Sequence, residues 1–373
     1  MRIGEIKRMN NKIRFGTWES VTIMLILFCT QIFLSFPRTM AEGAGNAGWI
    51  LVIYITVIVL VLFAIMSKLY SRFEGMDIID ISEYLAGNVG RVIAGTVFIV
   101  YLVSILSIVL REYAENVKTV SLPSTPIVYI MGFFAISMIV GAYAGIEALV
   151  RTSAISVPII AFAFFIIILG VSQYYDITNL FPILGTGAKD IFIEGIPKIS
   201  FFSAISILFF MSPFIRTHKS FKSVGYISIT IAGILLTFST LAYMLVFPYP
   251  ASLENILPIY SLARLINYGR FFQRIEALFV VIWDTVAMLY LSTGLFFTVY
   301  IFKKTFKLVY YKPLIIPFTI IILGLSLIPQ SYMAVVEIEN MYFRKIVLAV
   351  SFGFIIIIMS AALLFKKMQK RRK

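Results

Sequence analysis

Long apolar runs, separated by short stretches that carry most of the charged residues, make up nearly all of this chain of 373 residues. A helix needs about 20 apolar residues to cross the roughly 30 Å hydrocarbon core of a bilayer. Ten runs approach that length, and we expect each of them to form one membrane-spanning helix. Their predicted bounds are 19–36, 49–67, 92–110, 126–143, 152–171, 199–215, 224–247, 271–301, 313–328 and 346–365.

The stretches between the runs are too short to hold a soluble domain. We therefore expect one ten-helix transmembrane domain over residues 19–365, with cytoplasmic basic tails at 1–18 and 366–373. The basic leader before the first run is typical of a signal peptide, but the run is long and lacks a small-x-small cleavage site, which favours an uncleaved helix. Two connecting segments, 75–87 and 252–268, alternate apolar and polar residues, and we expect helices there that lie in the headgroup plane or cap a vestibule.

Composition excludes a soluble globular protein, and the distribution of charge predicts the topology. Hydrophobic residues make up 60% of the chain and charged residues only 13%, whereas about 25% are charged in soluble domains. The net charge of +14 would also suit a nucleic-acid-binding protein. With ten spans, however, 22 of the 32 lysines and arginines fall on the side of the two tails. The positive-inside rule then places both tails in the cytoplasm, and we expect no nucleic-acid partner.

Cysteine and histidine are too few to support metal or disulfide chemistry. Cys29 is the only cysteine and His218 the only histidine of the sequence. We expect Cys29 to pack between helices and His218 to be solvated in a cytoplasmic turn, where a role as a pH gate is the alternative. Because no phosphate loop, nucleophile–base pair or metal-ligand cluster stands out, we expect neither an enzyme nor a cofactor.

Dividing ten spans into five and five yields two halves of opposite orientation, as in transporters with inverted repeats. The first helix of each half is interrupted in such folds, and the ligand lies there near the midplane. The first run here carries Thr30, Gln31 and Ser35 before Pro37, and the sixth contains four serines and Pro213. We expect both helices to be broken. The alternative is that these residues serve only packing and kinks.

Four stretches of the chain carry a resemblance to a known family. They are LSFPRTMAEGAGNAGWI at the end of the first run, VLREYAENVKTVSLPSTP after the third, NLFPILGTGAKDIFIEGIP before the sixth and SLARLINYGRFFQRIEALFVVIWD at the start of the eighth. Through them the sequence resembles the B subunits of bacterial spore germinant receptors, the endospore germination permeases, which belong to the amino acid/polyamine/organocation transporter superfamily. The resemblance runs from about Thr17 to the tenth run.

This resemblance implies an all-α, LeuT-like fold of ten transmembrane helices in two inverted five-helix repeats, with helices 1 and 6 broken. It also implies a task and partners: sensing a small nutrient germinant such as an amino acid, in the inner membrane of the spore, beside an A membrane subunit and a C lipoprotein. Thr30 stands where the family usually has glycine, and its side chain would crowd a ligand carboxylate that approaches the backbone.

Asp284 lies in the middle of the eighth run with no other charge nearby. A carboxylate at the centre of a membrane helix costs about 2.5–3.5 kcal/mol on insertion scales, so it normally faces a cavity or a partner. We expect Asp284 to meet the ammonium group of a ligand or a coupling cation. The alternative is a protonated or hydrogen-bonded carboxyl group that holds a helix interface.

Several residues near the two predicted breaks complete a candidate ligand pocket. Tyr101, Ser104 and Ile105 share one face of the third run, although such a stripe also suits core packing. The other candidates come from the first, sixth and eighth runs: Thr30, Phe33, Ser35, Phe202, Ser203, Ser206, Thr285 and Met288. Arg111 and Glu115 are spaced for an ion pair at the outer mouth.

Three functions fit these features. The first is a germinant-sensing subunit that binds a nutrient near the midplane and passes a conformational change to its partners. The second is a self-sufficient, ion-coupled amino acid transporter, and the third is a membrane scaffold with a vestigial pocket. The fold alone does not separate them.

Overall fold

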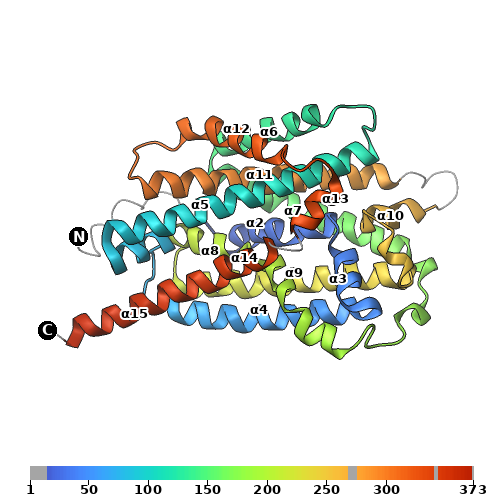
Figure 1. The fold of residues 1–373 in the computed structure, drawn as a ribbon, viewed down its shortest axis with the longest axis horizontal. Coiled ribbons are helices and arrows are strands. Elements are labelled where there is room, and N and C mark those ends of the chain that lie inside the picture. The colour runs from blue at the N-terminus through green and yellow to red at the C-terminus, as the bar shows by residue number, and fades with distance from the viewer. Residues whose placement is uncertain (1–14, 268–274, 340–342, 372–373) are drawn as a thin grey trace.

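The computed structural model describes residues 15–267, 275–339 and 343–371. Helices run roughly along the long axis of an elongated bundle (Figure 1). Within the described residues, eight helices are long and apolar enough to cross a membrane. They are Phe36–Tyr70, Ile78–Val120, Ile127–Ala144, Ile146–Tyr174, Ile196–Phe214, His218–Val246, Phe279–Thr305 and Arg344–Gln369.

The expected number of ten spans is therefore not reached by length and hydropathy. The first and ninth expected spans coincide with two shorter apolar helices, Thr17–Phe33 and Lys312–Ser326. The first is short because its helix is interrupted. The ninth has only α12 (Ile315–Ser326), after a 3₁₀ turn at Lys312–Leu314.

The first helix is broken in its middle, as expected. Helix α2 (Thr17–Cys29) tightens into a 3₁₀ turn at Thr30–Phe33, and Leu34 leaves helical geometry altogether with φ −106° and ψ −147°. A second helical piece, α3 (Phe36–Ala44), follows and leads into α4 (Gly48–Tyr70). The expectation that the helix ends near Pro37 is wrong, because proline fits the first turn of a helix and here it opens α3.

The sixth helix is also irregular. A π turn (Asp190–Glu194) and a 3₁₀ helix (Ile196–Phe202) precede the short α8 (Ile205–Met211). Serine side chains satisfy backbone carbonyls here, since the Ser206 hydroxyl donates to the Ser203 carbonyl at 2.9 Å. A second serine, Ser212, donates to the Phe209 carbonyl at 2.8 Å. Hydroxyl groups of this kind stabilise irregular backbone within a membrane protein.

The remaining helices are α5 (Ile78–Val120), α6 (Ile127–Ala144), α7 (Ile146–Gly170), α9 (His218–Val246), α10 (Pro258–Leu265), α11 (Ile275–Thr305), α13 (Tyr332–Ile338), α14 (Arg344–Leu348) and α15 (Ile355–Arg371). Helices α5, α7 and α9 begin before the corresponding predicted apolar runs, and α5, α11 and α15 end after them.

Polar residues at the helix ends account for these extensions. The first turn of α7 includes Glu147, which pairs with Arg151 at 2.6 Å. Helix α9 begins with His218 after its N-cap Thr217, so the expected turn at His218 is the first turn of a helix. The backbone amide of His218 donates to Glu74 at 2.8 Å. A hydropathy pattern ends at the last apolar residue, whereas the hydrogen-bonded helix continues through its charged ends.

Both connecting helices are present, but they pack on the protein. Asp77 caps the first, which runs from Ile78 to a kink where Gly87 adopts φ +62°. Its residues Ile78 and Ile81 are fully buried. The second is α10, which covers only half of the expected segment and buries Leu262; residue 268 lies outside the described part of the chain.

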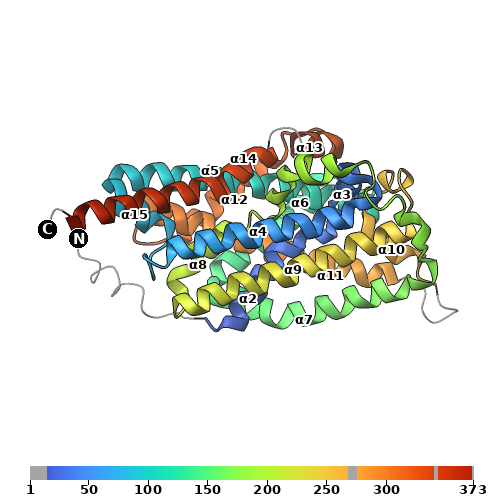
Figure 2. The same ribbon diagram turned by 90° about the horizontal axis from the view of Figure 1, so that it is seen from below.

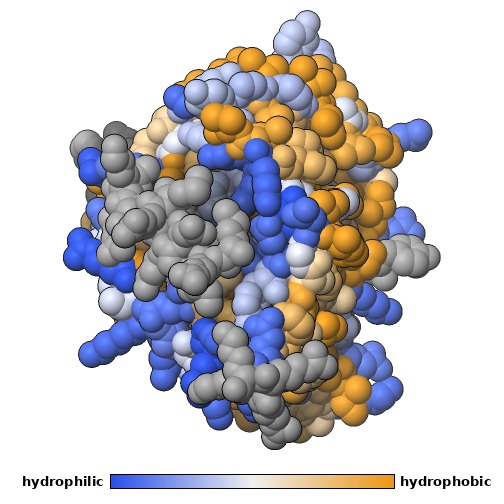
Figure 3. All heavy atoms as spheres, turned by 90° about the vertical axis from the view of Figure 1, so that its left-hand side faces the viewer, coloured by the Kyte–Doolittle hydropathy of each residue, from blue (hydrophilic) through white to orange (hydrophobic). Residues whose placement is uncertain are grey.

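Helix α2 occupies the centre of the bundle. It is surrounded by α7, α9 and α11 (Figures 1 and 2), and its residues from Ser20 to Phe28 are all buried. Apolar side chains on the outer helices face outward, such as Ile136 and Phe162. Hydrophilic side chains gather instead at the end where α15 stops (Figure 3). This distribution is typical of an integral, multi-pass membrane protein.

Candidate functional site

A small polar opening lies where the two broken helices meet α5, α11 and the last helical segments. It is lined by Gln31 from the first break, Ile105, Ile108 and Val109 from α5, Ser200, Phe201 and Ser203 from the sixth helix, Tyr290 from α11, and Glu339, Phe343, Arg344 and Val347. Its volume is about 30 Å³, which is enough for about two water molecules. Its walls must therefore separate before a larger ligand enters.

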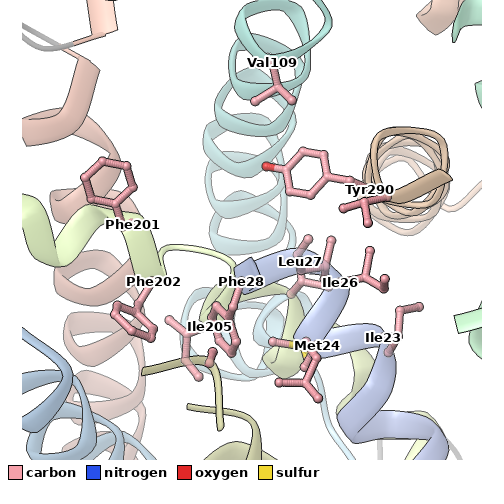
Figure 4. Close-up of a cluster of buried hydrophobic side chains, with 14 of the residues drawn as sticks. Ile23, Met24, Ile26, Leu27, Phe28, Val109, Phe201, Phe202, Ile205 and Tyr290 are labelled. Atoms are coloured by element: carbon pink, nitrogen blue, oxygen red, sulfur yellow. The ribbon is translucent and has the colours of Figure 1, made fainter. Parts of the chain in front are cut away.

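Three aromatic side chains, Phe201, Tyr290 and Phe343, contribute to its wall. In Figure 4, Tyr290 extends from α11 toward α5 below Val109 and Phe201 approaches from the sixth helix, whereas the neighbouring Phe202 packs outside the lining. Leu27 and Phe28 of α2 close the cluster from below in this view. Polar groups placed among apolar and aromatic side chains are typical of small-molecule sites.

Hydroxyl groups converge beside the opening. The Tyr101 hydroxyl donates to the Ser203 carbonyl at 3.4 Å, and Ser206 donates to the same carbonyl. Ser351, from the helix that leads into α15, interacts with the same tyrosine. The structure thus brings three predicted residues together, Tyr101, Ser203 and Ser206. Ser203 and a fourth predicted residue, Ile105, line the opening.

An ion pair borders the opening on its other side. Arg344 and Glu339 are 2.9 Å apart, and their side chains are only 6% and 14% exposed. The guanidinium group of Arg344 lies over the Phe201 ring, 3.7 Å from its centroid. Glu112 of α5 is buried and interacts electrostatically with both members of the pair. Lys198 of the sixth helix adds a second positive charge near them.

Some predicted residues serve packing and backbone bonds. Thr30 is fully buried, and its hydroxyl donates to the Ile26 carbonyl at 2.6 Å. Phe33 packs on Phe279, and Phe202 packs on Phe28. Ser35 interacts with Tyr332 of α13, so it lies toward the same side as Glu339. None of these four is among the residues that line the opening.

The eighth-span candidates also lie outside the wall. Asp284 is half-buried, and its Oδ1 is buried without a hydrogen-bond partner among the described residues. Thr285 donates to the Val281 carbonyl at 2.8 Å. Met288 packs partly buried against the core, and Ser104 is partly buried beside Ile105.

A second, apolar pocket lies between α2, α7, α9 and α11. Its wall includes Cys29, Phe33, Phe164, Leu235 and Val286. Cys29 is a free, partly buried thiol that packs against the hydrophobic core, as expected from the sequence.

Sequence reasoning missed most of the charged wall. Glu339 and Arg344 lie in what the apolar pattern assigns to a connection, because the last predicted span begins at residue 346, whereas the structural span begins at Arg344. Gln31 and Ser200 stand out as polar residues of the broken helices, but Tyr290 has no distinguishing signal in an aromatic-rich span. The predicted Arg111–Glu115 ion pair is present at 2.7 Å.

Charged groups also close the end of the bundle where α15 stops. The ammonium group of Lys304, from α11, contacts Asp77 and Asp80 at the start of α5. Tyr300 donates to Asp77 at 3.2 Å. Just beyond the end of α11, Lys307 pairs with Glu83 at 2.9 Å, and Glu83 also pairs with Arg91. These contacts tie the ends of α5 and α11 together.

Two comparisons of sequence identify relatives. Residues 17–335 match the family model described as spore germination protein. Spore germination protein KB of Bacillus subtilis is 23% identical over 262 residues, which cover 69% of this chain and 70% of that protein. Spore germination protein A2 of the same organism is 26% identical and covers 73% and 75% of the two chains.

Solved transporter structures share the fold. The chain is similar to Mhp1, a nucleobase-cation-symport-1 family transporter in a closed conformation with bromovinylhydantoin bound, with a TM-score of 0.68, 12% identity and coverage of 93% of this chain and 78% of that one. It is also similar to MhsT in complex with L-phenylalanine, with a TM-score of 0.67, 17% identity and coverage of 95% and 90%. At this identity the likeness concerns the fold, a LeuT-like all-helical architecture with helices 1 and 6 broken. With a family model that spans most of its length, this chain belongs to the spore germination proteins.

Proposed function

We propose that this chain is the nutrient-sensing membrane subunit of a germinant receptor, and that it binds a small germinant such as an amino acid in the opening between the broken helices. The observation that supports this most is the meeting of Gln31, Ser200 and Ser203 with Tyr290 at the interruptions of the first and sixth helices. Interrupted helices leave backbone groups that a ligand can contact near the midplane.

A ligand acts on such a protein only through different affinities for two conformations. The opening is too small for an amino acid as it stands, so binding requires the wall formed by α13 and α14 to move relative to α5 and the sixth helix. The movement of this wall away from α5 and the sixth helix is then the signal that the protein passes on. In the receptor, neighbouring subunits would detect it as a changed surface.

Asp284 keeps one of its predicted roles in this proposal. Its carboxylate is half-buried in a span and one oxygen has no hydrogen-bond partner among the described residues. Because Asp284 does not line the opening where the ligand is proposed to bind, this supports a place for a coupling cation rather than for the ligand ammonium group. The alternative is a protonated carboxyl group between helices.

The proposed setting is the inner membrane of the spore, with both tails cytoplasmic and with an A membrane subunit and a C lipoprotein as partners. The family resemblance supports the partners. The orientation is supported by the excess of basic residues at the end of the bundle where α15 stops. There the ammonium group of Lys366 in α15 donates to the Arg72 carbonyl, and the Phe15 backbone amide donates to the Phe214 carbonyl. No enzymatic step is part of the proposal.

A transporter uses the same fold and pocket, so the experiment must separate sensing from uptake. The full-length protein is reconstituted into liposomes, and binding and accumulation of radiolabelled nutrients are measured with and without pH and sodium gradients. We expect saturable binding without accumulation. Concentrative uptake by the chain alone contradicts the sensing role, and the absence of binding by any nutrient, together with a normal spore response after pocket substitution, contradicts both and favours the scaffold.

A further inference from the structure

The ion pair between Glu339 and Arg344 is largely buried and lies at the candidate ligand site. It is on the wall of the polar opening, where the side chain of Arg344 is 6% exposed and that of Glu339 is 14% exposed. Arg344 also stacks on Phe201, so its guanidinium plane is fixed against the sixth helix. A buried pair is poor evidence for stability, since the cost of removing both charges from water often exceeds their attraction. This position suggests a different use.

Ligand entry into the opening must disturb this pair. The cost of separating two buried charges limits which ligands can do so. A ligand with one charge replaces the ion-pair partner of one member and takes the ion-pair partner away from the other, which is unfavourable for a buried charge. An uncharged ligand satisfies neither fully. A zwitterion supplies both charges, so Glu339 and Arg344 can each exchange their partner without either being left alone.

We propose that the Glu339–Arg344 pair recognises a zwitterionic α-amino acid, with the ligand carboxylate on Arg344 and the ligand ammonium group on Glu339. The ligand replaces the direct ion pair as the wall formed by α13 and α14 moves relative to α5 and the sixth helix. This inference rests on the proposed function, because it assumes that the opening is the germinant site.

Two further features of the wall suit such a ligand. Ser200 lines the opening and is only 4% exposed. Its hydroxyl group has no hydrogen-bond partner among the described residues. Gln31 adds an amide from the first break. These groups can bond the second carboxylate oxygen and the remaining ammonium protons, because hydroxyl and amide groups both donate and accept.

The surrounding charges are compatible with this exchange. Glu112 of α5 and Lys198 of the sixth helix each interact electrostatically with both members of the pair. Glu42 of α3 interacts with Lys198. Arg38 is paired with Glu42 at 3.1 Å. A ligand with no net charge leaves the balance of these neighbours unchanged.

The test compares ligands that differ by one charge. The purified full-length protein in lipid nanodiscs is titrated with L-alanine, chosen for its small side chain, and with its methyl ester, N-acetyl-L-alanine and the uncharged nutrients glucose and inosine. We expect L-alanine to bind at least tenfold more tightly than its ester or its N-acetyl derivative. Equal affinities of the three overturn the inference.

Two variants assign the charges. In Arg344→Gln the preference for L-alanine over the methyl ester should fall at least fivefold, and in Glu339→Gln the preference over N-acetyl-L-alanine should fall likewise. Lys345→Gln changes a neighbouring exposed cation and should alter neither ratio. If both variants weaken the binding of all ligands equally, the pair has only a structural role and the inference is overturned. If a variant is too unstable to measure, the comparison of ligands on the wild-type protein decides.

The outcomes also separate the inference from the function on which it rests. Binding of glucose or inosine with no binding of L-alanine contradicts recognition by the ion pair and leaves a nutrient sensor. Failure of every nutrient to bind contradicts the proposed function itself.

Discussion

At the residue scale, charge inside the bilayer is the clearest guide to function, but only part of it is visible in the sequence. Asp284 stands out because its whole neighbourhood is apolar. Glu339 and Arg344 do not, because they lie next to other polar residues and look like part of a connection. What distinguishes them is their burial and the Phe201 ring above Arg344, and both depend on chain segments far apart in sequence.

Replacing Asp284 with asparagine tests the residue that the sequence singles out. The change keeps the shape and removes the negative charge, so we expect Asp284→Asn to abolish the germination response to a zwitterionic nutrient. The measurement is the dose response of spores that carry the variant.

Glu194→Gln is the control for that experiment, because Glu194 forms an exposed pair with Lys189 and exposed pairs contribute little stability. It should leave the response unchanged. An unchanged dose response of Asp284→Asn itself shows that the carboxylate has no part in ligand recognition or coupling.

At the element scale, hydropathy predicts which segments form helices, and local chemistry decides where they begin, break and end. The expected interruptions of the first and sixth helices are confirmed, since hydroxyl-rich segments tolerate irregular backbone. The predicted end at Pro37 is wrong because a proline that stops one helix equally starts the next. Helix ends rich in Glu, Lys or His, as at Ile146 and His218, are invisible to an apolar pattern.

Close approach of α4 and α9 is a second feature that hydropathy does not reveal. A Cβ atom at Gly225 of α9 would lie 1.9 Å from the Phe63 ring of α4. We expect Gly225→Val to destabilise the protein by about 1–3 kcal/mol, the usual cost of overpacking. The measurement is thermal unfolding in detergent.

Gly132→Val is the matched control for this substitution, because Gly132 is also in a helix and has no atom within 4 Å of the added Cβ. It should unfold close to the wild-type temperature. Equal stability of the two valine variants contradicts the close packing of α4 on α9.

At the scale of the whole molecule, the charged contacts of Lys304 and the narrow central opening describe one conformation closed at both places. The carboxylates of Asp77 and Asp80 are buried around the Lys304 ammonium group. The general arrangement of helices follows from the sequence and its family resemblance. This closed state does not, because it depends on side chains of α5 and α11 that are more than 200 residues apart.

Removing the lysine charge tests this contact. Lys304→Gln leaves two buried carboxylates without their cation, so we expect a loss of about 3–5 kcal/mol of stability, measured as a lower unfolding temperature. Lys303→Gln, the neighbouring lysine on α11, should change it little. A Lys304 variant as stable as the Lys303 variant shows that the contact does not hold α5 and α11 together.

The central claim is that a nutrient binds in the opening between the broken helices and that this binding is the signal. Ile105 lines the opening, whereas Val100 of the same helix is 60% exposed on its outer surface. The most direct measurement is the nutrient dose response of spores that carry Ile105→Trp or Val100→Trp, with the amount of each protein in the membrane verified. The account predicts at least a tenfold higher half-maximal concentration for Ile105→Trp and a wild-type response for Val100→Trp. A wild-type response with tryptophan at position 105 would contradict it.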